Sequence, residues 1–168
     1  MKKQLVTLLL ISILVFSCSD NRTAEEIFQD GSDYYKQEKV NRTIKTFDKL
    51  SNMYPDDPIA VKALYRLAEI YASDPKVQDF EACIAKYDYI ADEYPSHPDA
   101  PKARFMAGYT LANIMGDYDR AKVEYEKFIR DYPKHSLVES VQFELRNLGK
   151  ELDQIDELKG IMRSDSEE

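Results

Sequence analysis

Apolar and polar positions follow a helical period along most of the chain. Between Gly116 and Pro133, small and aromatic residues recur in steps of three and four, at Tyr118, Ala121, Tyr125, Phe128 and Tyr132. Asp117 can accept hydrogen bonds from the free amides of a helix start, and Pro133 cannot continue a helix. The pattern therefore predicts a short amphipathic helix with a defined beginning and end.

The same pattern occurs three times. A tyrosine precedes each of Pro55, Pro95 and Pro133, and these prolines are 40 and 38 residues apart. In the helix that precedes each proline, a set of four equivalent positions carries apolar or small residues in every copy. These are Val40, Phe80 and Tyr118; Thr43, Cys83 and Ala121; Phe47, Tyr87 and Tyr125; and Leu50, Ile90 and Phe128. The copies predict an internal repeat of helix pairs.

This repeat resembles the tetratricopeptide repeat (TPR), in which a glycine and a tyrosine lie three residues apart on the first helix. The matching pairs here are Gly31 and Tyr34, Ala68 and Tyr71, and Gly108 and Leu111. The chain departs from the motif at Thr43 and Cys83 (usually alanine), at Leu64 and Arg104 (usually tryptophan), and in a longer connection at Pro75–Val77. The resemblance implies an all-α, right-handed α-solenoid of about three TPR helix pairs plus a C-terminal capping helix.

Capping signals place the individual helices. Thr23 and Glu26 form a capping-box pattern, so the first helix is expected to run from there to about Lys36. The next five are expected over about 41–53, 58–73, 80–94, 99–114 and 118–132. Ser136 and Glu139 predict a seventh helix with apolar positions at Val141, Leu145, Leu148, Leu152 and Ile155. This helix either caps the last repeat or offers a surface stripe to a partner or second copy.

The N-terminus predicts an exported protein. Lys2 and Lys3 precede a nearly unbroken apolar run from Leu5 to Phe16, which as a helix would span about 18 Å, short of the roughly 30 Å of a bilayer core. Residues 1–17 are therefore interpreted as a signal peptide. The run ends in Val15-Phe16-Ser17-Cys18, which resembles a bacterial lipobox. The resemblance implies that Cys18 is acylated and anchors the protein in a membrane.

One alternative to this anchor stays open. Cys18 could instead be an ordinary cysteine in a signal peptide that is cut elsewhere. By analogy with sorting rules, Ser19 after the cysteine favours the outer membrane, with the protein facing the periplasm.

The expected organisation is a signal peptide (1–17), a lipidated tether (18–22), a TPR domain with its capping helix (23–159) and an acidic disordered tail (160–168).

Charge narrows the classes of partner. The formal net charge is −8, and removal of Lys2 and Lys3 with the signal peptide makes it −10. This balance argues against nucleic-acid binding, which needs a basic surface, and against electrostatic adhesion of the whole molecule to anionic lipid.

The sequence contains no arrangement that predicts catalysis. His97 and His135 occupy equivalent repeat positions and are interpreted as loop residues near helix starts, not as metal ligands. Cys83 occupies a small-residue position and is interpreted as a buried packing residue. We therefore predict no enzyme activity, no cofactor and no metal site.

The TPR resemblance implies a binding groove lined by the first helix of each pair. Carried over by motif position, the groove residues are Phe28, Tyr35, Lys36, Lys62, Tyr65, Lys102, Phe105, Tyr109, Asn113 and Phe143. Four of them form an aromatic ladder: Phe28, Tyr65, Phe105 and Phe143. An aromatic surface beside lysines suits an extended peptide with apolar anchors and an acidic group. The alternative is that the second helices partly bury these rings.

The lipobox and the Tyr-Pro-ended repeats together resemble the TPR lipoproteins of the outer-membrane β-barrel assembly machinery. They also resemble the TPR part of the Tol-Pal-associated cell-division coordinator. The first resemblance implies a scaffold in envelope assembly, and the second a coordinator of division or peptidoglycan synthesis. An accessory substrate-capture lipoprotein is a weaker alternative.

Overall fold

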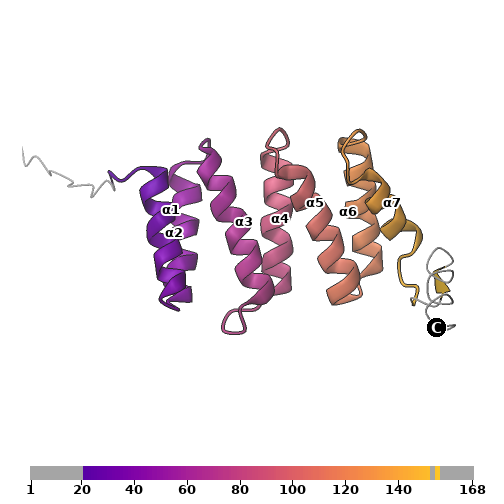
Figure 1. The fold of residues 1–168 in the computed structure, drawn as a ribbon, viewed down its shortest axis with the longest axis horizontal. Helices are drawn as coiled ribbons and strands as arrows, with labels where there is room; N and C mark the ends of the chain where they lie inside the picture. The colour runs from indigo at the N-terminus through magenta and orange to yellow at the C-terminus, as the bar shows by residue number, and fades with distance from the viewer. Residues whose placement is uncertain (1–20, 152–153, 156–168) are drawn as a thin grey trace, which may run out of the picture.

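The computed structural model describes residues 21–151 and 154–155 of the 168-residue chain. Within these residues the chain forms seven α-helices, one π-helical segment and no strand (Figure 1). The elements are α1 Ala24–Lys36, α2 Val40–Met53, α3 Pro58–Ser73, α4 Phe80–Glu93, α5 Ala100–Thr110, η1 Leu111–Met115, α6 Tyr118–Asp131 and α7 Val138–Arg146. The structure confirms the predicted all-α fold of stacked helix pairs.

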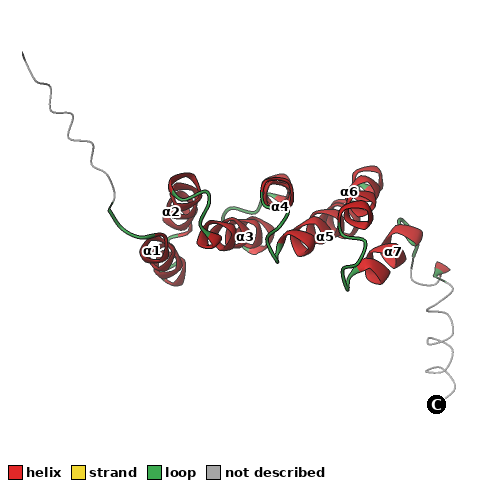
Figure 2. Ribbon diagram, turned by 90° about the horizontal axis from the view of Figure 1, so that it is seen from above, coloured by secondary structure: helices red, strands yellow, loops and turns green. Residues whose placement is uncertain are grey.

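The helices lie in two layers. Figure 2 shows α1, α3, α5 and α7 on one side, called the A layer here, and α2, α4 and α6 on the other, called the B layer. Each helix packs chiefly against the helices before and after it in the sequence. The stack therefore grows along one axis and leaves a long outer face on each layer (Figure 1).

Most helices begin where the sequence signals placed them. At α1 the predicted capping box is present, because the Glu26 amide donates to Thr23 Oγ1 (3.2 Å) and the Thr23 amide donates to Glu26 Oε2 (2.7 Å). The side chains of Asp57, Asp79 and Asp117 accept backbone amides at the starts of α3, α4 and α6.

One turn position has the same role in all three repeats. The residue two places after each repeat proline accepts a backbone amide from two residues further on: Ile59 to Asp57 Oδ1 (2.8 Å), Asp99 to His97 Nδ1 (3.1 Å) and Leu137 to His135 Nδ1 (3.2 Å). The two histidines therefore hold the turns from B to A helices, which agrees with their interpretation as loop residues.

A glycine makes room for an aromatic ring in two repeats. A Cβ atom on Gly31 would lie 2.4 Å from Cε1 of Phe47, and one on Gly108 would lie 2.6 Å from Cε1 of Tyr125. Both distances are far below van der Waals contact, so any larger residue would push the B helix away. The motif glycine is thus a packing residue in the first and third repeats.

The fifth helix differs from the prediction. An α-helix was expected to reach Ile114, but regular α-helix ends at Thr110 and the wider η1 turn continues to Met115. Gly116 then adopts a left-handed conformation with φ 68°, and the amide of Asp117 donates to the Leu111 carbonyl (2.9 Å). This geometry ends the helix and starts the turn into α6.

The prediction for the seventh helix was wrong at both ends. The helix starts at Val138, so that Leu137 and not Ser136 takes the N-cap position and the predicted Ser136–Glu139 capping box does not form. The helix stops at Arg146, and Gly149 has φ 74°, so the apolar spacing beyond it does not continue one helix. Val141 is fully buried against the last repeat.

Ion pairs join successive B helices on their outer side. Lys86 Nζ of α4 bonds Asp48 Oδ1 of α2 (2.7 Å), and Arg120 of α6 makes a two-point contact with Glu81 of α4 (2.8 and 2.9 Å). These partners are 38 and 39 residues apart, which is the repeat length. Each pair therefore links equivalent surfaces of neighbouring repeats.

A buried ion cluster joins α4, α5 and α6. The Arg104 side chain is only 2 % exposed, and its guanidinium donates to Asp88 (3.3 Å), to Glu124 (2.8 Å) and to Asp92. Lys127 bonds the other oxygen of Glu124 (2.8 Å). Arg104 occupies the motif position of the usual tryptophan, so a charged network replaces aromatic packing here.

Several predictions concern residues outside the described part. The signal peptide, Cys18, Leu152 and the acidic tail all lie there. Among the helices of residues 21–151, none combines the length and the apolarity that a bilayer crossing requires.

Candidate binding groove

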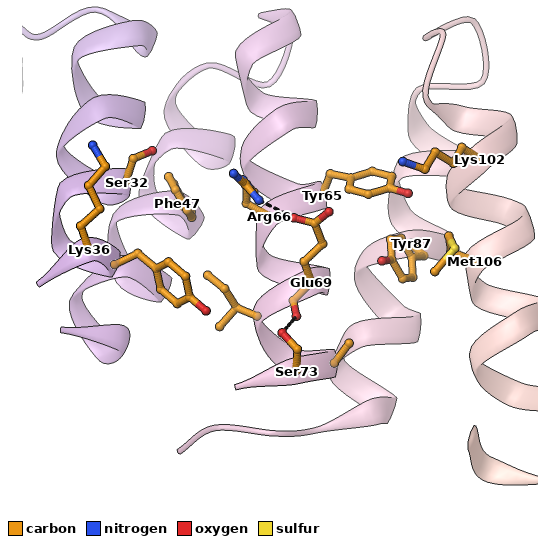
Figure 3. Close-up of a pocket in the computed structure, with 13 residues that line it drawn as sticks. Ser32, Lys36, Phe47, Tyr65, Arg66, Glu69, Ser73, Tyr87, Lys102 and Met106 are labelled. Atoms are coloured by element: carbon orange, nitrogen blue, oxygen red, sulfur yellow. Dashed lines mark hydrogen bonds and ion pairs between the residues drawn. The ribbon is translucent and has the colours of Figure 1, made fainter. Parts of the chain in front are cut away.

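A cavity of about 610 Å³ opens on the A layer between α1, α3 and α5 (Figure 3). Its floor is largely apolar and comes from both layers, with Phe47, Tyr65, Ile70, Tyr87 and Met106. The remaining lining residues are Ser32, Tyr35, Lys36, Arg66, Glu69, Ala72, Ser73 and Lys102. Both layers therefore build the cavity, and the buried B-layer rings of Phe47 and Tyr87 are part of its base.

Three cations surround this floor. Lys36 of α1 and Lys102 of α5 lie on opposite sides of α3, which carries Arg66 (Figure 3). Lys102 Nζ lies 4.9 Å from the centre of the Tyr65 ring, a cation–π contact that leaves the ammonium at the cavity wall. Glu69 is the one carboxylate in the lining, and Arg66 Nη1 bonds it (2.8 Å). The cavity therefore carries an excess of positive charge on an acidic protein.

The Tyr65 hydroxyl is a buried polar group without a hydrogen bond among the described residues. Burial raises the pKa of this phenol, and nearby Glu69 and Asp99 act in the same direction. The Tyr87 hydroxyl lies close enough to influence that pKa, but the pair does not meet hydrogen-bond geometry. A buried hydroxyl without a partner is costly, so a ligand group that bonds it would gain affinity.

A second cavity of about 250 Å³ continues the first along the A layer. It shares Tyr65, Arg66, Glu69 and Lys102 with the larger cavity and adds Phe28, Lys62 and Asp99. Together the two cavities form a groove, called the A-face groove here, that crosses α1, α3 and α5. A groove of this extent suits an extended chain better than a compact small molecule.

The structure divides the predicted groove residues into two groups. Six of them line the A-face groove: Phe28, Tyr35, Lys36, Lys62, Tyr65 and Lys102. The other four lie beyond it, on α5, η1 and α7: Phe105, Tyr109, Asn113 and Phe143. The binding surface that the structure offers is thus centred on the first two repeats.

The aromatic ladder is partly covered by the B layer. Three of the four ladder rings contact the aromatic ring of their own pair: Phe28–Phe47 (5.3 Å between centroids) and Phe105–Tyr125 (6.1 Å) are stacked, and Tyr65–Tyr87 (5.2 Å) meet edge to face. The ladder rings are all half-buried. This is the geometry of the alternative weighed above, so the ladder contributes to the core as well as to the outer face.

Some groove residues were absent from the sequence prediction. Arg66, Ile70, Ser73 and Met106 line the cavity but were not named. Arg66, Ile70 and Ser73 follow Lys62 at helical spacing, and Met106 follows Lys102 by four, so the lysines could have indicated them. Phe47 and Tyr87 belong to the B layer and are each only 2 % exposed, so the motif positions of the A helices could not have indicated them.

Cys83 lies outside the groove and is fully buried. Burial raises the pKa of its thiol to about 11, so the thiolate that redox chemistry requires is scarce at neutral pH. Its position in the main core cluster agrees with the interpretation of Cys83 as a packing residue.

Comparison with known families matches both halves of the chain. The family described as outer membrane lipoprotein (YfiO) matches residues 20–116, a range that contains every residue lining the larger cavity. The tetratricopeptide repeat family matches residues 102–135, which cover α5 and α6. No curated protein matches this sequence. Because the first match spans more than half of its length, the chain belongs to the outer membrane lipoprotein family YfiO, and it is built from tetratricopeptide repeats.

Proposed function

We propose that this protein is a non-enzymatic scaffold that binds extended segments of partner proteins in the A-face groove during outer-membrane protein assembly. The groove itself carries the proposal, because it combines an apolar floor with three cations at its walls. Such a site accepts a peptide that buries apolar side chains against the rings and places a carboxylate near Lys36 or Lys102.

The family supports the proposed location. An outer membrane lipoprotein with an acylated Cys18 would hold its repeats at the periplasmic surface of that membrane. Membership of this family favours the assembly role over a coordinator of cell division or peptidoglycan synthesis. No feature of the described residues favours substrate capture.

Acylation is tested by metabolic labelling with an alkyne analogue of palmitate. The wild-type protein should incorporate the label, and Cys18→Ala should lose it while Cys83→Ala keeps it. Label retained in Cys18→Ala would contradict the anchor.

The groove is tested by site-specific photo-crosslinking in intact cells. A benzoylphenylalanine replaces Tyr35, which lines the groove and is 42 % exposed, or Tyr89, which is 48 % exposed on α4. The proposal expects outer-membrane assembly proteins among the products from position 35 but not from position 89. Products that are equal at both positions would contradict a specific groove.

A pair of charge reversals sharpens this experiment. Lys36→Glu with Lys102→Glu should abolish the crosslinks from position 35, whereas Lys122→Glu with Lys134→Glu changes the net charge equally outside the groove and should preserve them. Recovery of division or peptidoglycan-synthesis proteins instead would favour the coordinator role.

A further inference from the structure

Positive charge is concentrated on one B helix. Helix α2 carries three cationic side chains and one carboxylate. Helix α4 carries one cationic side chain and four carboxylates, and α6 carries four of each. The single carboxylate of α2, Asp48, is already bonded to Lys86 of the next repeat. The outer face of α2 is therefore the basic end of a B layer whose middle is acidic.

The cations of α2 point away from the core. Arg42, Lys45 and Lys49 follow one another at helical spacing and are all exposed, while the buried residues Val40, Thr43, Phe47 and Leu50 occupy the opposite face. Lys39, at the start of α2, adds a fourth exposed cation beside them. We call Lys39, Arg42, Lys45 and Lys49 the basic stripe.

The end of α2 is bonded to the chain that leads to the lipid anchor. The Tyr54 hydroxyl, directly after α2, donates to the Arg22 carbonyl (2.6 Å). Cys18 precedes Arg22 by four residues, a span of at most about 14 Å when fully extended. An acylated Cys18 would thus keep the basic stripe near the membrane surface.

We propose that the basic stripe of α2 docks on anionic phospholipid headgroups, so that the first repeat lies against the membrane. The inference rests on the lipid anchor of the proposed function but not on the groove. The overall net charge of −8 argues against lipid adhesion of the molecule as a whole, yet cations near an anionic surface act locally, within about a Debye length. With α2 at the membrane, the groove on the A layer would stay open to partners.

Vesicle flotation tests the electrostatic contact without the acyl chains. The chain from Ser19 to Glu168 keeps every described residue and all their contacts, and it is mixed with vesicles of phosphatidylcholine alone or with about one-third phosphatidylglycerol. We expect binding only to the anionic vesicles, and loss of that binding at high salt. Equal binding to both vesicle types, or no binding to either at low salt, would overturn the proposal.

Charge reversal locates the contact. Arg42→Glu, Lys45→Glu and Lys49→Glu together should weaken binding to the anionic vesicles at least about tenfold. Lys122→Glu, Lys134→Glu and Lys150→Glu change the net charge equally on exposed positions of the last repeat, and they should have a much smaller effect. Circular dichroism checks that both variants keep their helices. Equal losses in the two variants would show that only net charge matters.

The last experiment measures energy transfer in the acylated full-length protein. A fluorophore on Asn52→Cys reports on the outer face of α2, and one on Val123→Cys reports on α6. With an energy acceptor among the lipids, transfer should rise in anionic vesicles for position 52 and not for position 123. The triple charge reversal on α2 could leave this energy transfer unchanged but remove crosslinks to an acidic protein. That result would overturn the proposal and show that the basic stripe binds the acidic protein instead. Failure of acylation would contradict the anchor while leaving the flotation result interpretable.

Discussion

Two neighbouring repeat interfaces in this protein use different chemistry at equivalent positions. In the second repeat the A helix places Leu64 in the apolar core, and a partly exposed Asp48–Lys86 pair closes the outer side. In the third repeat Arg104 takes the place of Leu64, and Glu124 stands where Lys86 does. The apolar interface is a sum of many small contacts, whereas the ionic one depends on Arg104, because removal of this buried cation would leave the surrounding carboxylates uncompensated.

The ionic interface also responds to pH. Burial, followed by the charge of Glu124, raises the pKa of Asp88 from 3.8 to about 6, although Arg104 and Lys127 oppose the shift. The fold thus favours the protonated form of Asp88. The stability from this group is complete below about pH 4 and is lost as the pH rises through about 6. The apolar interface has no comparable group at Leu64.

The most severe test of the comparison removes Arg104. Arg104→Ala leaves three carboxylates around an empty site and should lower the free energy of unfolding by about 4 kcal/mol. Urea unfolding followed by circular dichroism measures the change. Arg120→Ala, which removes an exposed arginine that pairs with Glu81 of α4 and with Asp117, is the matched control and should cost less than about 1 kcal/mol. Similar losses would mean that the cluster has no special role.

Leu64→Ala tests the apolar counterpart. Removal of a buried leucine side chain should cost about 3 kcal/mol through lost burial and the cavity left behind. Unlike the loss in Arg104→Ala, this loss should be the same at pH 5 and pH 7. A strong pH dependence of the Leu64→Ala effect would show that the two interfaces are coupled.

Asp88→Asn tests the pH response directly. With the carboxylate replaced by a neutral amide, the protein should be more stable than wild type at pH 7, by about 1 kcal/mol once partial solvent screening of Asp88 is allowed for. The wild type should gain thermal stability between pH 7 and pH 5, and the variant should lose most of that gain. Asp119→Asn, an exposed position on α6, serves as the control. An unchanged pH profile in Asp88→Asn would remove Asp88 from the explanation.

Lys86→Ala should have the smallest effect. The Asp48–Lys86 pair is partly exposed, with side-chain exposures of 39 % and 26 %, so its loss should cost no more than about 1 kcal/mol. The cost should shrink at high salt. A loss as large as that of Arg104→Ala would contradict the distinction between the two interfaces.

Local signals predicted the helices well because their ends depend on neighbouring residues. Thr23, Asp57, Asp79 and Asp117 each cap the helix that follows in sequence. The prediction failed at Ser136, because α7 begins at Val138 and Leu137 takes the N-cap position. It also missed the π-helical turn of η1, because no local sequence signal marks the change of hydrogen-bond pattern after Thr110.

The groove was predictable only in part. Motif positions identify residues that share a helix face, and this gave Tyr65, Lys62 and Lys102. They do not show where a cavity opens between the A helices, so Phe105 and Tyr109 could not be separated from the residues that line the cavity. Arg104 was visible as a departure from the motif, but its partners on α4 and α6 depend on the packing of three helices.

The ion pairs between repeats also bear on how such a chain can grow. An acidic residue lies seven places before the proline in every repeat, as Asp48, Asp88 and Glu126. For Asp48 and Asp88, the cation that pairs with this residue belongs to the following repeat, as Lys86 and Arg104 respectively. Each unit therefore carries the partner for whatever unit precedes it. An in-frame duplication of residues 56–95 would set a second copy of Lys86 against Asp88, so recombination could lengthen the array by one module without creating a mismatched junction at this position.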